Sequence, residues 1–453
     1  MSAPLSRIEL LVFVFCFSFF FFYPTFFFSV DELSYVTRAL AFSEGMNSWT
    51  QITVLENEFS WAPADYPLGT AFLLAPFAWF FGKGIFLSGM VYILIGIYFI
   101  YKTLQKLDKV SILPFVIFFI FPPTIYFSRG VMSEMPSLTL ISFFLYGYVS
   151  WKSGWKKFLA LGTLAGLSIL LRETNILVCG GLVLLPCFRN IKYFTGFSIG
   201  VALGVVPRLL TGNYFYGNGI YVKKAASFDW FAISHNFTLY LIISLVLLPG
   251  GLYVLYKLKG IFARSIQLSL GLFIVLHLFY TYHSGDHSGS LVSVFYNGRY
   301  FIPTLPLWCV AYAGFAKQNN FFNTNRFNKI TIGVCLLFII SFHGFLNYLG
   351  DKHEEVAMDI FENYNDEIII YHNAAYRYLN PLHGTINQLM LVDETSQLSE
   401  KAYYVLSHRN KTKAQEKELN SHLNQIEHTK ELIKTYQIFD GTEVLVFSIT
   451  HNE

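Results

Sequence analysis

Residues 8–35 read IELLVFVFCFSFFFFYPTFFFSVDELSY. No charged residue occurs from Leu10 to Val30, and an apolar run of this length can cross a bilayer as a helix. We therefore expect a transmembrane segment over residues 8–30. Asp31 and Glu32 follow at once, so the sequence predicts a pair of carboxylates where this segment leaves the membrane. Ionisable groups at a membrane boundary are commonly functional, because burying them is costly.

The composition indicates a polytopic membrane protein. Hydrophobic residues make up 54% of the chain and charged residues only 13%, whereas soluble domains carry about a quarter charged residues. The formal net charge of +3 is too small to indicate a nucleic-acid partner. The five cysteines lie within or at the ends of apolar runs, which favours small core hydrophobes over a disulfide framework or a zinc site.

Apolar segments recur along the first 350 residues. We expect about eleven transmembrane helices, near residues 8–30, 85–101, 111–127, 132–150, 158–171, 174–188, 193–211, 237–256, 265–281, 299–316 and 330–349. The sequence therefore predicts an all-α polytopic membrane domain over residues 1–350.

The segment at residues 66–84 is apolar but interrupted by Pro67 and Pro76, so it is either a further span or a helix in the membrane interface. Loop charge favours the interfacial helix, because a crossing here would place the lysine-rich loops, such as the one at residues 152–157, outside the cell. We expect a cytoplasmic N-terminus, an external loop over residues 31–84 and an external C-terminus.

From Asp351 the sequence becomes polar, which predicts a separate soluble α/β domain over residues 351–453 on the external side. Residues 367–372 and 402–407 have the pattern of short buried strands, and residues 412–436 that of a polar helix. Residues 437–450 suggest two strands around Asp440-Gly441.

With these spans and this orientation, charged side chains from several loops lie on the external face of the membrane. They are Asp31, Glu32, Asp65, Arg129, Glu134, Arg172, Glu173, Lys223, Lys224, Asp229, His283, Asp286, His287 and Arg299. Two carboxylates from different segments, close to arginines, suit an inverting displacement at a sugar carbon. One carboxylate takes the proton of the attacking hydroxyl, and the arginines stabilise the departing phosphate. The alternative is that each acid pairs with a neighbouring base to orient a helix end, which is slightly favoured for Arg172 and Glu173.

Residues 283–287 (HSGDH) contain donor types that occur in metal sites, but their glycine and serine are more typical of a solvated loop. A divalent metal such as Mg²⁺ or Mn²⁺ would assist a diphosphate leaving group, whereas arginine alone can serve a monophosphate. Asp31, Glu134, His283, Asp286 and His287 are the weak candidate ligands, and the sequence leaves metal use open.

Five motifs occur in an order that resembles the GT-C class of membrane glycosyltransferases. The resemblance is strongest to the branch containing protein O-mannosyltransferases and the lipid A aminoarabinose transferase, glycosyltransferase families 39 and 83. The motifs are DELSY at 31–35, YPLG at 66–69, YFSRGVMSEMP at 126–136, LLRET at 170–174 and NGRYFIPTLP at 297–306. The similarity covers roughly residues 1–350. The single proline of the second motif departs from the double proline of many relatives, so the acceptor type stays open.

The resemblance implies a polyprenyl-phosphate sugar donor, with hexosyl or pentosyl transfer to a lipid, glycan or protein acceptor outside a bacterial inner membrane. It implies Asp31 as general base or acceptor-orienting group, Glu32 beside it and Glu134 as a second acid. Arg299 and Tyr300 would hold the donor phosphate, assisted by Arg129 and Arg172, and Tyr35, Asp65 and Tyr66 would contact substrate.

A flippase or polymerase-like carrier of lipid-linked saccharides is the main alternative, and a scaffold acting through its tail is another. A carrier is expected to place charges near the bilayer midplane and often contains repeated halves. Here the acids gather at one face and no repeat is evident. A scaffold function gives no reason for the carboxylate pair Asp31 and Glu32 at the end of the first span.

Overall fold

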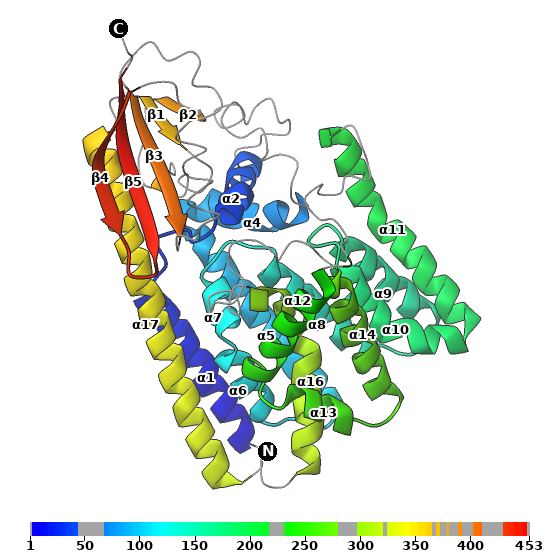
Figure 1. Ribbon diagram of the computed structural model, residues 1–453. Helices are drawn as coiled ribbons and strands as arrows, with labels where there is room; N and C mark the ends of the chain where they lie inside the picture. The colour runs from blue at the N-terminus through cyan, green and yellow to red at the C-terminus, as the bar shows by residue number, and fades with distance from the viewer. Residues whose placement is uncertain are drawn as a thin grey trace.

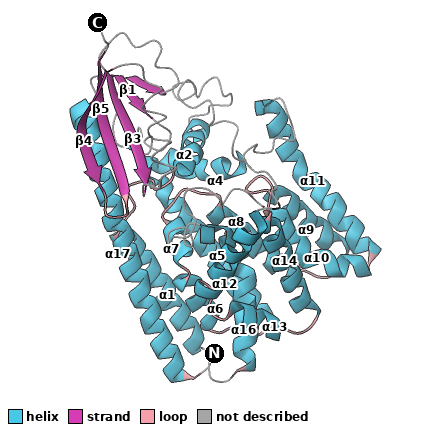
Figure 2. Cartoon of the chain, viewed as in Figure 1, coloured by secondary structure: helices cyan, strands magenta, loops and turns pink. Residues whose placement is uncertain are grey.

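The computed structural model describes residues 2–43, 68–216, 230, 232–279, 297–319, 324–364, 368–371, 378–379, 388–391, 402–409 and 429–450. Figure 2 shows a bundle of helices with one β-sheet at its C-terminal end. The helices are α1 (Ser2–Phe21), α2 (Val30–Ser43), α4 (Leu68–Phe81), η2 (Gly82–Phe86), α5 (Leu87–Lys106), α6 (Leu113–Ile120), α7 (Pro122–Ser128), α8 (Glu134–Ser150), α9 (Trp155–Ser168), α10 (Asn175–Arg189), α11 (Ile191–Tyr216), α12 (Ala232–Val246), α13 (Gly251–Lys257), α14 (Ile261–Leu278), η4 (Arg299–Thr304), α16 (Leu305–Gln318) and α17 (Asn325–Tyr364).

The expected helical membrane domain is present, but the expected count of about eleven spans is not confirmed. Within the described residues, 4 helices are long and apolar enough to cross a membrane, or 5 if the bent pair α12 and α13 counts as one span. Proline shortens the expected span at residues 111–127: Phe121 is extended, and Pro122 separates α6 from α7. A residue before proline is driven away from the helical region, which explains the break.

The first apolar run is also divided. Helix α1 ends at Phe21, and α2 starts at Val30, so Asp31 and Glu32 lie in the first turn of α2 rather than at the end of the first span. Pro24 falls in the gap between the two helices, where no amide donor is needed. Acidic residues in a first helical turn are stabilised by the helix dipole, and Glu32 Oε2 also accepts the Ser29 N–H at 2.9 Å.

Helices α9 and α11 pack backbone to backbone through glycines. A Cβ added at Gly162 would lie 2.1 Å from the Phe197 carbonyl oxygen, and one at Gly200 would lie 2.1 Å from that of Leu159. Small residues four apart allow such close approach in membrane bundles. Figure 1 shows α11 on the outside of the bundle, and its large exposed hydrophobic side chains include Leu203 and Leu210.

Helix α17 connects the bundle to the sheet. It runs without a break across residue 350 and lies alongside α1 (Figure 1), and at the far end from the sheet Arg7 Nη2 donates to Asn325 Oδ1 at 2.7 Å. At the opposite end α2 and α4 lie between the bundle and the sheet, and Phe42 stacks on Phe72 with ring centroids 4.2 Å apart.

The sheet has the strand order β2-β1-β3-β5-β4. Its strands are β1 (Ile368–Tyr371), β2 (Gln388–Leu391), β3 (Ala402–Arg409), β4 (Thr429–Gln437) and β5 (Thr442–Thr450). Strand β1 pairs in parallel with β2 and β3, whereas β5 pairs antiparallel with β3 and β4.

Two strands flank the turn at Asp440-Gly441 as expected, and Gly441 provides the positive φ of 85° that this turn requires. The first of them, β4, lies over residues 429–437 rather than within the expected range of 437–450. The expectation of a helix over residues 412–436 is wrong for residues 429–436, which form β4. Backbone pairing with β5 outweighs the local preference of this polar segment, as is common for strands.

Candidate functional site

Two acids and two arginines from distant parts of the chain meet at the sheet side of the bundle. Arg172 Nη1 lies 3.0 Å from Glu134 Oε1, Arg299 Nε lies 3.7 Å from the same oxygen, and Arg299 Nη1 lies 3.5 Å from Asp31 Oδ2. We call these four residues, with Tyr300, the acid–arginine cluster.

Short turns and helix ends present the cluster. Asp31 and Glu134 lie in the first turns of α2 and α8, where a carboxylate is favoured. Arg172 lies in the turn between α9 and α10, and Arg299 starts η4. Helix α8 packs against η4, which brings Glu134 to Arg299.

Tyr300 links the two arginines. Its ring centroid lies 4.5 Å from Arg172 Cζ and 5.0 Å from Arg299 Cζ, and Arg299 Nη2 donates to its hydroxyl at 3.0 Å. Guanidinium groups are attracted to aromatic faces, more strongly where water is excluded. Because Tyr300 is 5% exposed, this contact fixes both guanidinium groups in place.

The two carboxylates differ in exposure. The side chain of Glu134 is 3% exposed, whereas that of Asp31 is 22% exposed. Glu134 Oε1 accepts from Arg172, and Glu134 Oε2 makes no hydrogen bond within the described part of the chain. Glu134 is therefore placed to hold the arginines, and Asp31 is the carboxylate that a substrate can reach.

Tyr35 belongs to the same region. It is 3% exposed, and burial raises the pKa of its phenol, with the negative charges of Glu134 and Asp31 acting in the same direction. Tyr35 consequently keeps its proton at neutral pH and can donate a hydrogen bond.

Glu32 is outside the cluster, although it adjoins Asp31. Its Oε1 accepts the Val131 N–H at 2.8 Å, and a Cβ at Gly130 would lie 2.6 Å from that oxygen. Burial raises the pKa of Glu32 to about 7, against the opposing effect of its backbone hydrogen bonds. Glu32 ties α2 to the turn at residues 129–133, which leads directly into Glu134.

The structure does not bring Arg129 to the cluster. Its Nη1 donates to the Phe22 carbonyl and lies 3.2 Å from His343 Nδ1, and its Nη2 donates to Asn347 Oδ1 at 3.3 Å. Arg129 therefore joins the end of α1 to α17.

Other expected site residues lie outside the part of the chain that the structure describes. They are Asp65, Tyr66, Lys223, Lys224, Asp229, His283, Asp286 and His287. Among the described residues, no group of three or more His, Cys, Asp or Glu could hold a metal ion. Asp31 and Glu134 pair with two arginines, so the charge of these carboxylates is balanced by protein groups.

Arg208 is a further basic residue on this side that the sequence motifs did not single out. It is 6% exposed in α11, and its Nη2 lies 3.5 Å from Glu173 Oε1, next to Arg172. A charge well inside an apolar helix is the signal that points to Arg208.

No protein-family model matches the chain, and no curated protein sequence is detectably similar to it. Two similar solved structures are of ArnT from Cupriavidus metallidurans, a lipid A aminoarabinose transferase of the GT-C class. The structure bound to undecaprenyl phosphate has 11% sequence identity and a TM-score of 0.57, covering 98% of this chain and 97% of that chain. The apo structure has 12% identity and a TM-score of 0.58, covering 98% of both chains. The GT-C-like fold that the ordered motifs predict is thereby confirmed.

Proposed function

We propose that the chain is an integral-membrane glycosyltransferase that moves a sugar from a polyprenyl-phosphate donor to an acceptor, with inversion at the sugar carbon. The observation that supports this most is the acid–arginine cluster, in which a reachable carboxylate lies 3.5 Å from a buried arginine. The fold is shared with ArnT, one crystal structure of which holds undecaprenyl phosphate.

In this proposal Asp31 acts as general base. It accepts the proton of the acceptor hydroxyl while that oxygen forms a bond to the anomeric carbon. The bond from that carbon to the phosphate oxygen breaks, and its electron pair leaves with the polyprenyl phosphate. The leaving group gains negative charge, which Arg299 and Arg172 stabilise because a guanidinium group binds phosphate oxygens and remains charged.

Glu134 and Tyr300 hold the two arginines before the donor arrives. Such preorganisation lowers the barrier, because the groups that stabilise the developing charge need not reorganise during the reaction. Tyr35 can donate its hydroxyl proton to a substrate oxygen in the same region. We assign Glu32 a positioning role, through the turn that carries Glu134.

The location of the charges favours a transferase over a carrier of lipid-linked saccharides. Asp31, Glu134, Arg172 and Arg299 each lie in a first helical turn or in a connecting turn. A carrier is expected to place its charged groups midway along the helices, near the bilayer centre.

The proposal covers hexosyl or pentosyl transfer to a lipid, glycan or protein, as the family resemblance implies. It places the chain in a bacterial inner membrane, with the N-terminus cytoplasmic, the cluster external and residues 351–453 as an external domain.

Asp31→Asn tests the proposal in isolated membranes supplied with polyprenyl-phosphate-linked sugar. Removing the base should lower sugar transfer by about a hundredfold or more while the protein remains inserted. Asp108→Asn is the matched control, because the side chain of Asp108 is 97% exposed and pairs with Lys317 at the other end of the bundle. Transfer at the wild-type rate by Asp31→Asn would show that Asp31 is not the base.

A further inference from the structure

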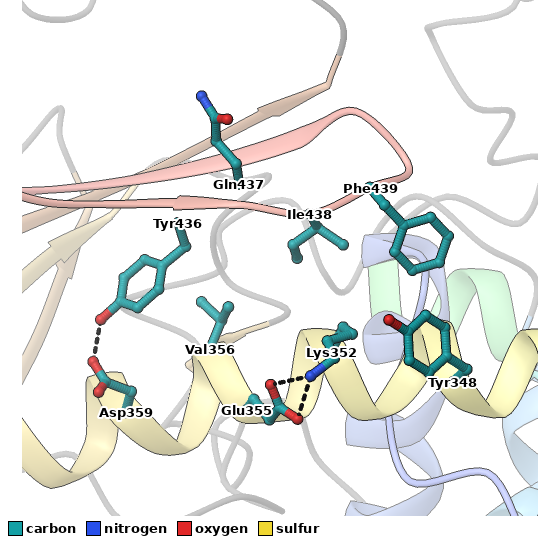
Figure 3. A pocket seen from close by; sticks show the side chains of 9 residues that line it. All are labelled: Tyr348, Lys352, Glu355, Val356, Asp359, Tyr436, Gln437, Ile438 and Phe439. Atoms are coloured by element: carbon teal, nitrogen blue, oxygen red, sulfur yellow. Dashed lines mark hydrogen bonds and ion pairs between the residues drawn. The ribbon is translucent and has the colours of Figure 1, made fainter.

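A groove of about 480 Å³ lies between α17 and the β4–β5 hairpin, remote from the acid–arginine cluster (Figure 3). Tyr348, Lys352, Glu355 and Asp359 line its helix side, and Phe439 and Tyr436 line its hairpin side. The groove combines an aromatic end, at Tyr348 and Phe439, with charged groups further along.

The groove continues a lipid-facing surface of α17. Ile330, Val334, Leu337, Phe345 and Tyr348 are all exposed, and their spacing places them on one side of the helix. Their helix is one of the candidate membrane spans. An exposed apolar stripe on such a helix faces lipid, and this stripe ends at Tyr348, the first residue of the groove.

The tip of the β4–β5 hairpin is held beside Tyr348, where the apolar stripe of α17 ends. Phe439 is 53% exposed, and its ring stacks on Tyr348 with centroids 5.3 Å apart. The next residue, Asp440, places Oδ2 3.4 Å from Nε2 of the fully buried His353. The turn is thus fixed beside the end of the lipid-facing stripe, where aromatic side chains favour the boundary between acyl chains and headgroups.

The groove offers charges of both signs just beyond this aromatic pair. Lys352 Nζ lies 2.7 Å from each carboxylate oxygen of Glu355. Asp359 Oδ2 lies 2.7 Å from Nζ of Lys434, a residue that is not part of the groove lining. The side chains of Lys352 and Glu355 are 39% and 64% exposed, so a ligand can reach both. One lysine beside two acids suits a headgroup that is itself zwitterionic, whereas an anionic headgroup would be repelled by the acids.

We propose that this groove binds a phospholipid headgroup from the leaflet on the sheet side, and that the headgroup carries a phosphate and a primary ammonium. Lys352 binds the phosphate and Glu355 binds the ammonium, while Tyr348 and Phe439 lie among the upper acyl chains. The bound lipid fixes the depth of the sheet relative to the membrane. This inference does not depend on the proposed sugar transfer.

The membrane contact is tested with the full-length chain in nanodiscs, using a fluorophore attached to Phe439→Cys. Lipids carrying a spin label near the headgroup should quench this fluorophore severalfold more than iodide does. A label at Glu431→Cys is the matched control, because residue 431 lies in β4 roughly 20 Å from the turn that carries Phe439. The control should be quenched mainly by iodide. Tyr348→Cys gives a second reporter from α17, and equal lipid quenching at 431, 439 and 348 would overturn the proposal.

The headgroup assignment is tested by native mass spectrometry of the protein released from nanodiscs of mixed lipids. Phosphatidylethanolamine should be retained over phosphatidylcholine, which lacks N–H donors, and over anionic phosphatidylglycerol. Lys352→Ala and Glu355→Ala should each abolish this preference. Lys317→Ala is the control, because it breaks a similar lysine–acid pair at the other end of the bundle. Retention of phosphatidylglycerol in preference, or no effect of Lys352→Ala, would refute the assignment.

Discussion

The two arginines of the cluster have different neighbours and should therefore differ in effect when changed. Arg172 contacts Glu134 and the Tyr300 ring, whereas Arg299 contacts both acids and the Tyr300 hydroxyl. Lysine keeps the charge of arginine but loses its planar fork. A substitution by lysine at either site thus tests geometry rather than charge.

We expect Arg299→Lys to raise the KM for the polyprenyl-phosphate donor by about tenfold or more, corresponding to roughly 1.5–3 kcal/mol for a hydrogen bond to a charged group. Initial rates at varied donor concentration measure this. Arg172→Lys should act in the same direction with a smaller effect, because Arg172 has no contact with Asp31 among the described ion pairs. A change confined to the KM for the acceptor would contradict the phosphate role.

Glu32 should make stability depend on pH. Its pKa is raised in the folded protein, from 4.5 to about 7, so between these values the folded state holds a proton that the unfolded state has lost. The free energy of unfolding then falls as pH rises through this interval. Thermal unfolding of detergent-solubilised protein should show Glu32→Gln gaining stability relative to wild type between pH 5 and pH 8. A difference between the two that does not vary with pH would show that Glu32 does not titrate here.

Helix packing leads us to expect that the bundle tolerates little change where α9 packs against α11. The crossing depends on glycines whose missing side chains let one backbone approach the other. Elsewhere a glycine is open to substitution: a Cβ at Gly271, in α14, would meet nothing within 4 Å.

Gly200→Leu should destabilise the protein by about 1–3 kcal/mol, since the added side chain overlaps the Leu159 carbonyl and forces the helices apart. Gly271→Leu adds the same atoms to a helix without this overlap and should leave stability unchanged or slightly raised. Thermal unfolding in one detergent compares the two variants. Equal loss of stability in both would mean that the α9–α11 crossing is not the cause.

The two ends of the helical bundle carry different groups. One end carries the Arg7–Asn325 and Lys317–Asp108 contacts, and the other carries the acid–arginine cluster and the sheet (Figure 1). The loops at the first end are rich in lysine and arginine, and on this ground we propose that this end faces the cytoplasm.

Cysteine labelling in intact cells tests this orientation. A membrane-impermeant maleimide should label Glu431→Cys, which lies on an exposed strand, and should label Asp108→Cys only after the membrane is permeabilised. Labelling of residue 108 in intact cells, without labelling of residue 431, would invert the proposed topology.

Much of the architecture follows from local sequence. The long apolar runs predict a membrane protein. The spans expected at 111–127 and 132–150, and at 158–171 and 174–188, leave short connections, which the structure has between α7 and α8 and between α9 and α10. The break within the span expected at residues 111–127 and the strand over residues 429–436 were not predictable in this way. Proline breaks and strand pairing override the hydropathy pattern and the local preference on which those expectations depend.

By itself the sequence determined the class of protein, the turns that carry charged side chains and the candidate set of acids and arginines, because these depend on composition and short-range pattern. Only the tertiary structure separated Asp31, which faces Arg299, from Glu32, which is bound to the backbone of Val131. It also showed that Arg129 lies outside the cluster and that Glu134 contacts both Arg172 and Arg299. Asp31 and Arg299 are 268 positions apart, and contact over such a separation is set by helix packing, which no local pattern encodes.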